Sequence, residues 1–278
     1  MALTREMDSP LLSEDEALRK AALLQLGNVP TQEAAKAVIN ALLHFLKERP
    51  EVASEFEHVL YTPPLGPLAE EPLLHLLDEE DDAVREEAAY ILFKLKIRTS
   101  SRARISKALT DDDSAWVRAY AAKSLAMLQG AEASAQLASA IDDEATLEAI
   151  ARMGEAIALT GDASQAGVLR DQAEQLRERS APKDANQPAI WVKSASEIAL
   201  FLDALAAHLE GQAPEGATLE PRGGHVWRYA HPDFGEIEVG GGASHFGYAA
   251  RVKRGETTSA LELDSPEALK LLSTADRV

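Results

Sequence analysis

Apolar positions between residues 72 and 128 recur with helical spacing, and the same pattern is written twice. Aligning the pair Val84-Arg85 with the pair Val117-Arg118 places leucines and alanines over one another at a period of 33 residues. Apolar residues three and four positions apart form one face of a helix. Each copy therefore predicts a helix, an acidic turn and a second helix. A repeat of this length and plan is typical of an α-solenoid, whose units bury their apolar faces on one another.

The helical pattern begins before these two copies. Residues 14–26 predict a helix, with Ser13 and Glu16 spaced as a capping box, and a second apolar stripe completes a hairpin before Pro50. A helix at 51–60 then meets Tyr61-Thr-Pro-Pro-Leu-Gly-Pro67, where the prolines oppose regular helix. We interpret this segment as a break that redirects the chain, and projection as a binding loop is the alternative.

Residues typical of helix N-termini occur in both central copies. Pro67 suits the first turn of a helix that runs to about residue 77. Asp81 or Asp82 can cap the second helix of the first copy, and Asp113 or Ser114 can cap its counterpart in the next. Carboxylates at these starts also suit the helix dipole.

The two copies resemble the HEAT-like repeats first recognised in phycobilisome bilin lyases. The shared pattern is a leucine-rich helix, an aspartate-rich turn, Val-Arg, two residues, Ala-Ala, two residues and Leu. It is carried by Asp82, Val84, Arg85, Ala88, Ala89 and Leu92, and again by Asp112, Val117, Arg118, Ala121, Ala122 and Leu125. The resemblance implies an all-α superhelix over 12–179, strongest at 72–128, in which the aspartates and arginines form a structural ladder between neighbouring turns. The units at either end are less regular, as terminal repeats must face water.

The pattern changes after residue 179. Residues 180–188 are polar and contain two prolines, which predicts a linker. We interpret 189–278 as a small α+β domain with a mostly antiparallel sheet. It would begin with a short strand at 189–192 and a helix capped at Ser194. Alternating residues then predict strands at 225–231, 236–239, 246–252 and 257–263, a turn at 240–242 and a last helix capped at Ser265.

Composition narrows the function classes. Hydrophobic residues make up 46% of the chain and aromatic residues only 5%, which suits close-packed helices. A formal charge of −18 argues against binding of nucleic acids or anionic membranes and fits a basic protein partner. With no cysteine, disulfide and thiol chemistry are excluded. We expect a cytoplasmic protein, because no leader pattern or long apolar span is seen.

Two charged clusters in the repeats are candidate partner surfaces. The first is the set of acidic turns, which recur at the repeat period; helix caps and solvated turns are the alternative. The second is a run of cations without an intervening acid, which could hold a phosphate or an acidic peptide. We favour for it a role in neutralising the adjacent acidic turns. The candidate residues are Asp78, Glu79, Glu80, Asp111 and Asp112 in the first cluster, and Lys94, Lys96, Arg98, Arg102, Arg104 and Lys107 in the second.

The C-terminal segment adds two weaker candidates. Trp227 and Tyr229, with Phe246 and Tyr248, would form either the core of the sheet or a partner-facing surface, and core is favoured. His231 and His245 could meet across a hairpin and bind a metal. Zinc ligands are usually more tightly spaced, so we favour surface positions and expect no metal or cofactor. The same reasoning applies to the remaining polar side chains there, namely His225, Asp233, Glu236 and Glu238.

Catalytic patterns are missing from the sequence. It has no glycine-rich phosphate loop, no Gly-x-Ser-x-Gly and no cysteine nucleophile. It also lacks the His-Glu pairs of HEAT-type hydroxylases, and its acidity opposes a HEAT-like DNA glycosylase. We therefore predict a non-catalytic protein-binding protein, of the inhibitor or immunity type, directed at a basic partner such as a toxin domain. An adaptor in a larger assembly is the alternative, and a bilin-lyase-like or chaperone role is a third.

Overall fold

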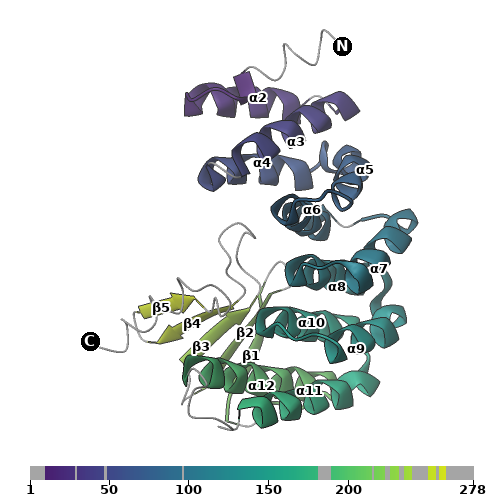
Figure 1. The fold of residues 1–278 in the computed structure, drawn as a ribbon, viewed down its shortest axis with the longest axis vertical. Helices are drawn as coiled ribbons and strands as arrows, with labels where there is room; N and C mark the ends of the chain where they lie inside the picture. Colours follow the sequence, from purple (N-terminus) through teal and green to yellow (C-terminus); the bar gives the residue numbers. More distant parts are fainter. Residues whose placement is uncertain are drawn as a thin grey trace. The chain divides into compact units, whose positions relative to one another are not determined.

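The computed structural model describes residues 10–28, 30–46, 49–95, 97–180, 189–214, 216–222, 226–231, 235–239, 250–254 and 257–260. Helices occupy the described part of the chain as far as residue 209, and strands follow (Figure 1). The chain divides into two compact units between Ser124 and Leu125, within one helix. The predicted all-helical N-terminal region is confirmed.

Unit 1 is built from helical hairpins. α3 packs on α4 and α5 packs on α6, and α4 also packs on α6, so the second helices of successive hairpins are in contact. The second helices α2, α4, α6, α8 and α10 begin 32 to 34 residues apart, which confirms the predicted period. The helices that begin in this unit are α2 (Glu16–Gly27), α3 (Gln32–Leu46), α4 (Pro50–Tyr61), α5 (Gly66–Leu76), α6 (Asp82–Leu95), α7 (Arg102–Asp111) and α8 (Ala115–Gln129), with a 3-10 turn η1 (Thr99–Ser101) before α7.

Helix starts in unit 1 follow the expected chemistry with one exception. Asp81 accepts from the backbone N–H of Ala83 at 3.0 Å, and the hydroxyl of Ser114 accepts from that of Trp116 at 3.2 Å. The capping box predicted at Ser13 is wrong, because α2 begins at Glu16 and Asp15 caps it. The Asp15 carboxylate lies closer to the first free N–H groups, and Ser13 instead accepts from the N–H of Asp15.

The proline-rich segment joins α4 to α5 through a short turn. Regular helix ends at Tyr61, and α5 starts at Gly66 with Pro67 in its first turn. Leu65, the last residue of the turn, is fully buried. The segment therefore redirects the chain, as predicted, and the side chain of Leu65 fastens it to the core.

Unit 2 continues the helical pattern. α9 packs on α10, and α12 packs along α11 and also on α10. α10 and α12 approach closely at Gly154, where a Cβ atom would lie 2.4 Å from Leu202 Cδ2. The elements of the helical part are η2 (Gly130–Ala133), α9 (Ser134–Asp142), α10 (Leu147–Thr160), η3 (Ala163–Gln165), α11 (Ala166–Ser180) and α12 (Ala189–Leu209).

The strand predicted at residues 189–192 is wrong, because these residues form the first turn of α12. Ser194, predicted to cap a helix, lies inside α12 for the same reason. A run of four apolar residues fits a strand or a buried helix equally well, and the stripe beginning at Ile198 extends back through it. The predicted linker is outside the described residues from 181 to 188.

The described strands form one antiparallel sheet in the order β1-β2-β3-β4-β5. The ring of Tyr229 in β2 contacts Phe201 of α12 edge-on at 6.1 Å between centroids. The turn at 240–242 and the helix predicted from Ser265 lie outside the described residues, and a separate α+β domain over 189–278 stays a prediction. The strands are β1 (Thr218–Arg222), β2 (Val226–His231), β3 (Gly235–Val239), β4 (Ala250–Arg254) and β5 (Thr257–Ala260).

Candidate partner-binding site

The acidic turn before α6 is held in place by Arg85. Its guanidinium donates to the backbone carbonyls of Glu79 and Glu80 at 2.9 and 3.1 Å and to the carboxylate of Asp82 at 2.7 Å. It also reaches the next turn, where its Nε lies 3.0 Å from the carboxylate of Asp112. This is the ladder between neighbouring turns that the resemblance implied, with a structural role.

The same arginine geometry recurs in three repeats. Arg19, Arg85 and Arg118 each donate to the carbonyls five and six residues earlier in the chain. Because a guanidinium presents several donors in a fixed plane, it can fasten both carbonyls and a carboxylate together. The turns are consequently rigid supports for the side chains that they carry.

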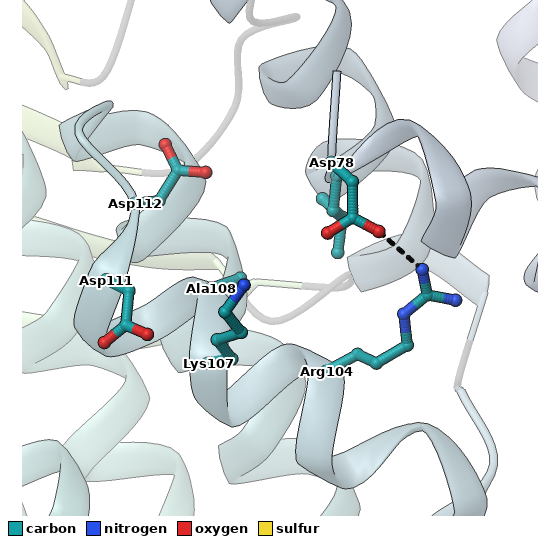
Figure 2. A pocket seen from close by; sticks show the side chains of 7 residues that line it. Asp78, Arg104, Lys107, Ala108, Asp111 and Asp112 are labelled. Atoms are coloured by element: carbon teal, nitrogen blue, oxygen red, sulfur yellow. Dashed lines mark hydrogen bonds and ion pairs between the residues drawn. The ribbon is translucent and has the colours of Figure 1, made fainter. Parts of the chain in front are cut away.

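A pocket of about 130 Å³ opens between the turn after α5 and helix α7. Figure 2 shows Asp78 and Arg104 facing each other on one side, with Lys107 and the two aspartates at the end of α7 on the other. Arg104 donates to Asp78 at 2.7 Å. The lining residues are Leu77, Asp78, Arg104, Lys107, Ala108, Asp111 and Asp112. The pocket thus brings together members of both charged clusters predicted from the sequence.

Carboxylates predominate around this pocket. The side chains of Asp78, Glu79, Glu80 and Asp111 are exposed, and we call this set the acidic turn surface. Asp112, also predicted as a contact, is instead nearly buried against Arg85. The acidic turn surface therefore exposes negative charge to solvent. Within it, Arg85 holds the backbone of Glu79 and Glu80.

Two members of the basic run, Arg98 and Arg104, contact acidic groups of the preceding repeat. Arg98 donates through its backbone N–H and its Nε to the buried carboxylate of Glu70 at 3.0 and 2.9 Å, and Ser101 also donates to Glu70. Arg104 contacts Asp78 and, at 3.4 Å, Glu71. These contacts support the expected neutralising role. Because these cations are paired, only the rest of the run is available to a ligand.

Three other cations of the run differ. Arg102 and Lys107 are exposed and form no ion pair with the residues that the structure describes. Lys94 points its ammonium at the rings of Tyr90 and Phe93, 5.4 and 5.1 Å from their centres. Lys96 lies outside the described residues. Arg102 and Lys107 are therefore the exposed cations of α7 without an ion pair among the described residues, whereas Arg98, which precedes η1, is exposed but paired with Glu70.

Of the aromatic candidates of the sheet, the structure describes the surroundings of Tyr229. Tyr229 is 2% exposed, and burial raises the pKa of its hydroxyl to about 12, so its ring belongs to the core. Trp227 lies on β2 between Pro221 and Val239 in register. His231 ends the same strand, opposite Gly235.

The remaining candidates of the C-terminal segment, namely His225, Asp233, His245, Phe246 and Tyr248, are outside the described residues. Glu236 and Glu238 lie on β3, paired in register with β2 and β4. Within the described ranges, no three His, Cys, Asp or Glu side chains gather as metal ligands.

A cluster that sequence reasoning missed lies on the second helices of unit 1. Glu57 of α4 and Glu87 of α6 are buried, as is Lys123 of α8, whose ammonium lies 5.1 Å from the ring of Phe93. Glu57, Tyr90 and Lys123 are spaced by one repeat period. Polar residues repeating at that period on apolar helices were the signal that could have revealed the cluster.

Comparison with known proteins identifies the repeats. Residues 70–159 match the family model of HEAT repeats, which covers the two central copies and the hairpin of α9 and α10. No curated protein matches the chain. None of the helices in the described ranges is long and apolar enough to cross a membrane. Together with the repeat period and the arginine ladder, the match shows that residues 70–159 of this chain are similar to HEAT repeats.

Proposed function

We propose that this chain is a non-catalytic protein-binding protein whose acidic turn surface recognises a basic partner. The observation that carries the proposal is the fixed acidic turn, in which Arg85 holds the carbonyls of Glu79 and Glu80 while their carboxylates face solvent. HEAT repeats generally mediate contacts between proteins, which supports the non-catalytic part of the proposal.

Preorganisation makes this surface suited to electrostatic recognition. A partner with clustered lysines or arginines would meet carboxylates that are already placed, so little conformational entropy is lost on binding. The net charge of −18 would also accelerate the encounter with such a partner. An inhibitor or immunity protein directed at a basic effector, such as a toxin domain, is the specific role that we propose.

To test the proposal, the partner is captured with the full chain, identified and purified, and its Kd is then measured. We expect the double variant Glu79→Lys, Glu80→Lys to raise the Kd at least tenfold, and the wild-type Kd to rise steeply between 50 and 300 mM salt, where screening strengthens. The matched control is Asp142→Lys, Asp143→Lys, which makes the same charge change at the exposed C-terminal end of α9. Equal effects of the two double variants, or a Kd indifferent to salt, would overturn the proposal.

An adaptor role is the second candidate, and exposed leucines favour it. Leu18 and Leu24 of α2 are 50% and 71% exposed, which offers an apolar contact separate from the acidic turn surface. An adaptor that uses this helix would bind in a manner insensitive to salt. Leu24→Glu would abolish such binding, whereas the Glu79→Lys, Glu80→Lys variant would retain it.

A further inference from the structure

The pocket between the turn after α5 and helix α7 is lined by side chains of both signs. Its volume of about 130 Å³ is room for roughly four water molecules at about 30 Å³ each, which suits one short side chain of a partner. Leu77 and Ala108 supply the apolar part of the lining, and two cations and three carboxylates supply the charge. The ligand of such a pocket is decided by which of these charges the chain itself leaves open.

Arginines of the chain already bind two of the three carboxylates. Asp78 accepts from Arg104 at 2.7 Å, and Asp112 accepts from the Nε of Arg85 at 3.0 Å. Lys107 differs, because it is exposed and forms no ion pair within the described ranges. Figure 2 shows its side chain extending from α7 into the space between Asp78 and Asp112. The ammonium of Lys107 is therefore available to an anionic group.

The third carboxylate, that of Asp111, does not occupy this ammonium. Asp111 lies one turn after Lys107 on α7, and its carboxylate accepts from the hydroxyl of Thr110 at 2.8 Å. A lysine that precedes an acid by four residues is also the weaker order for an ion pair on a helix. The pocket thus keeps an open cation from Lys107 beside an exposed carboxylate.

Both ends of α7 are fixed, so the pocket exists before a ligand arrives. Before the first turn, the buried carboxylate of Glu70 accepts from the backbone N–H and the Nε of Arg98 at 3.0 and 2.9 Å. After the last turn, Arg85 holds Asp112, and between the two ends the side chain of Ile105 is buried. Binding would therefore order few groups of this chain.

The mixture of charges disfavours a ligand of a single sign. A simple anion would meet the carboxylates of Asp78 and Asp111, and a simple cation would meet the ammonium of Lys107. A carboxylate flanked by cationic side chains avoids both conflicts. Its oxygens contact Lys107, and the flanking cations contact the acidic turn surface.

We propose that this pocket takes a carboxylate of the basic partner and that Lys107 selects it. The inference rests on the proposed function, because the acidic turn surface binds the residues on either side of that carboxylate. The carboxylate belongs either to an aspartate or glutamate side chain or to the carboxyl terminus of the partner. Lys107 then fixes the register in which the basic residues of the partner bind, since any other register places a cation against it.

Three short peptides test the pocket in the full chain at low salt. Two are Lys-Lys-Glu-Lys-Lys and Lys-Lys-Gln-Lys-Lys with both ends blocked, and the third is the glutamine peptide with a free carboxyl terminus. NMR titration gives each Kd. Net charge alone predicts that an added carboxylate weakens binding to this acidic chain. We expect the opposite for at least one carboxylate peptide, a Kd about three- to fivefold below that of the blocked glutamine peptide, as one partly exposed ion pair provides.

The carboxylate peptide that binds more tightly identifies the source of the carboxylate. In Lys107→Gln this preference should disappear. Arg102→Gln is the matched control, because it removes the same charge from an exposed position of α7 outside the pocket lining, and it should keep the preference.

Weaker or equal binding of both carboxylate peptides by the wild type would overturn the inference, as would an equal loss of preference in the two variants. Either outcome leaves the proposed function standing, since the Glu79→Lys, Glu80→Lys variant tests that separately. If no peptide binds at millimolar concentration, the inference also fails, and the measurement with the captured partner alone decides the proposed function.

Discussion

Arg85 and Asp112, which are 27 residues apart in the chain, join the acidic turns of two successive repeats. Their side chains lie 3.0 Å apart and are only 11% and 8% exposed. The pair therefore links one repeat to the next, and the same arginine holds the backbone of Glu79 and Glu80 in the acidic turn surface.

Removal of Arg85 should be strongly destabilising. Arg85→Ala leaves the carboxylate of Asp112 nearly buried without this cation, and it leaves the carbonyls of Glu79 and Glu80 without this donor. We expect a loss of about 3 kcal/mol in the free energy of unfolding, measured by urea denaturation. Arg102→Ala, at an exposed position, should change it by no more than about 0.5 kcal/mol. Similar losses in the two variants would contradict the structural role.

A methyl group at Gly154 should disturb the contact between α10 and α12. In Gly154→Ala the new Cβ would lie 2.4 Å from Leu202 Cδ2, so either the buried side chain of Leu202 or one of the helices must shift. Overpacking of this kind costs about 1–3 kcal/mol, which thermal unfolding would show as a lower Tm. Gly167→Ala in α11 is the control, because nothing lies within 4 Å of its Cβ position, and it should be neutral or slightly stabilising.

Stability should fall as pH rises from about 4.5 to about 8. The pKa of Glu57 is near 4.5 in the unfolded chain and about 8 in the fold, so the folded state binds the extra proton across this window. The stabilisation that this proton contributes is complete below pH 4.5 and lost above about pH 8. Chemical denaturation should give a slope of up to about 1.4 kcal/mol per pH unit.

In the Glu57→Gln variant, the free energy of unfolding should fall less steeply with pH. The residual slope comes from Glu86, whose pKa burial raises as well. A wild-type free energy of unfolding that rises across this pH range would contradict the predicted fall.

The contact of Tyr229 with Phe201 should secure the sheet to α12. Tyr229→Ala removes a buried ring, which typically costs about 3–5 kcal/mol locally. Limited proteolysis should then cut the strands faster while α11 and α12 keep their resistance. Thr218→Ala in β1, an exposed strand residue that lies opposite Ala230, serves as the control and should give a smaller change. Equal acceleration in all helices would mean that Tyr229 supports the whole chain.

The repeats were predictable because their signals are local. A helix start such as Ser114 and an arginine that binds carbonyls of its own turn can be read from short stretches of sequence. The four apolar residues from Ala189 were misread because so short an apolar run fits a strand or the start of a helix equally well, and they form the first turn of α12. The buried residues Glu57, Glu87 and Lys123 escaped because their burial depends on the packing of helices from different repeats.

Gly154 also limits how the array can change length. α12 covers both α10 and α11, and the branched side chain of Leu202 occupies the space that the glycine leaves. A duplicated repeat inserted directly after α11 would have to displace this long apolar helix. Insertion before α9 would leave the packing of α12 on α10 and α11 intact. We therefore expect related chains of different lengths to keep the sequence from α10 to α12 and to gain or lose repeats upstream of it.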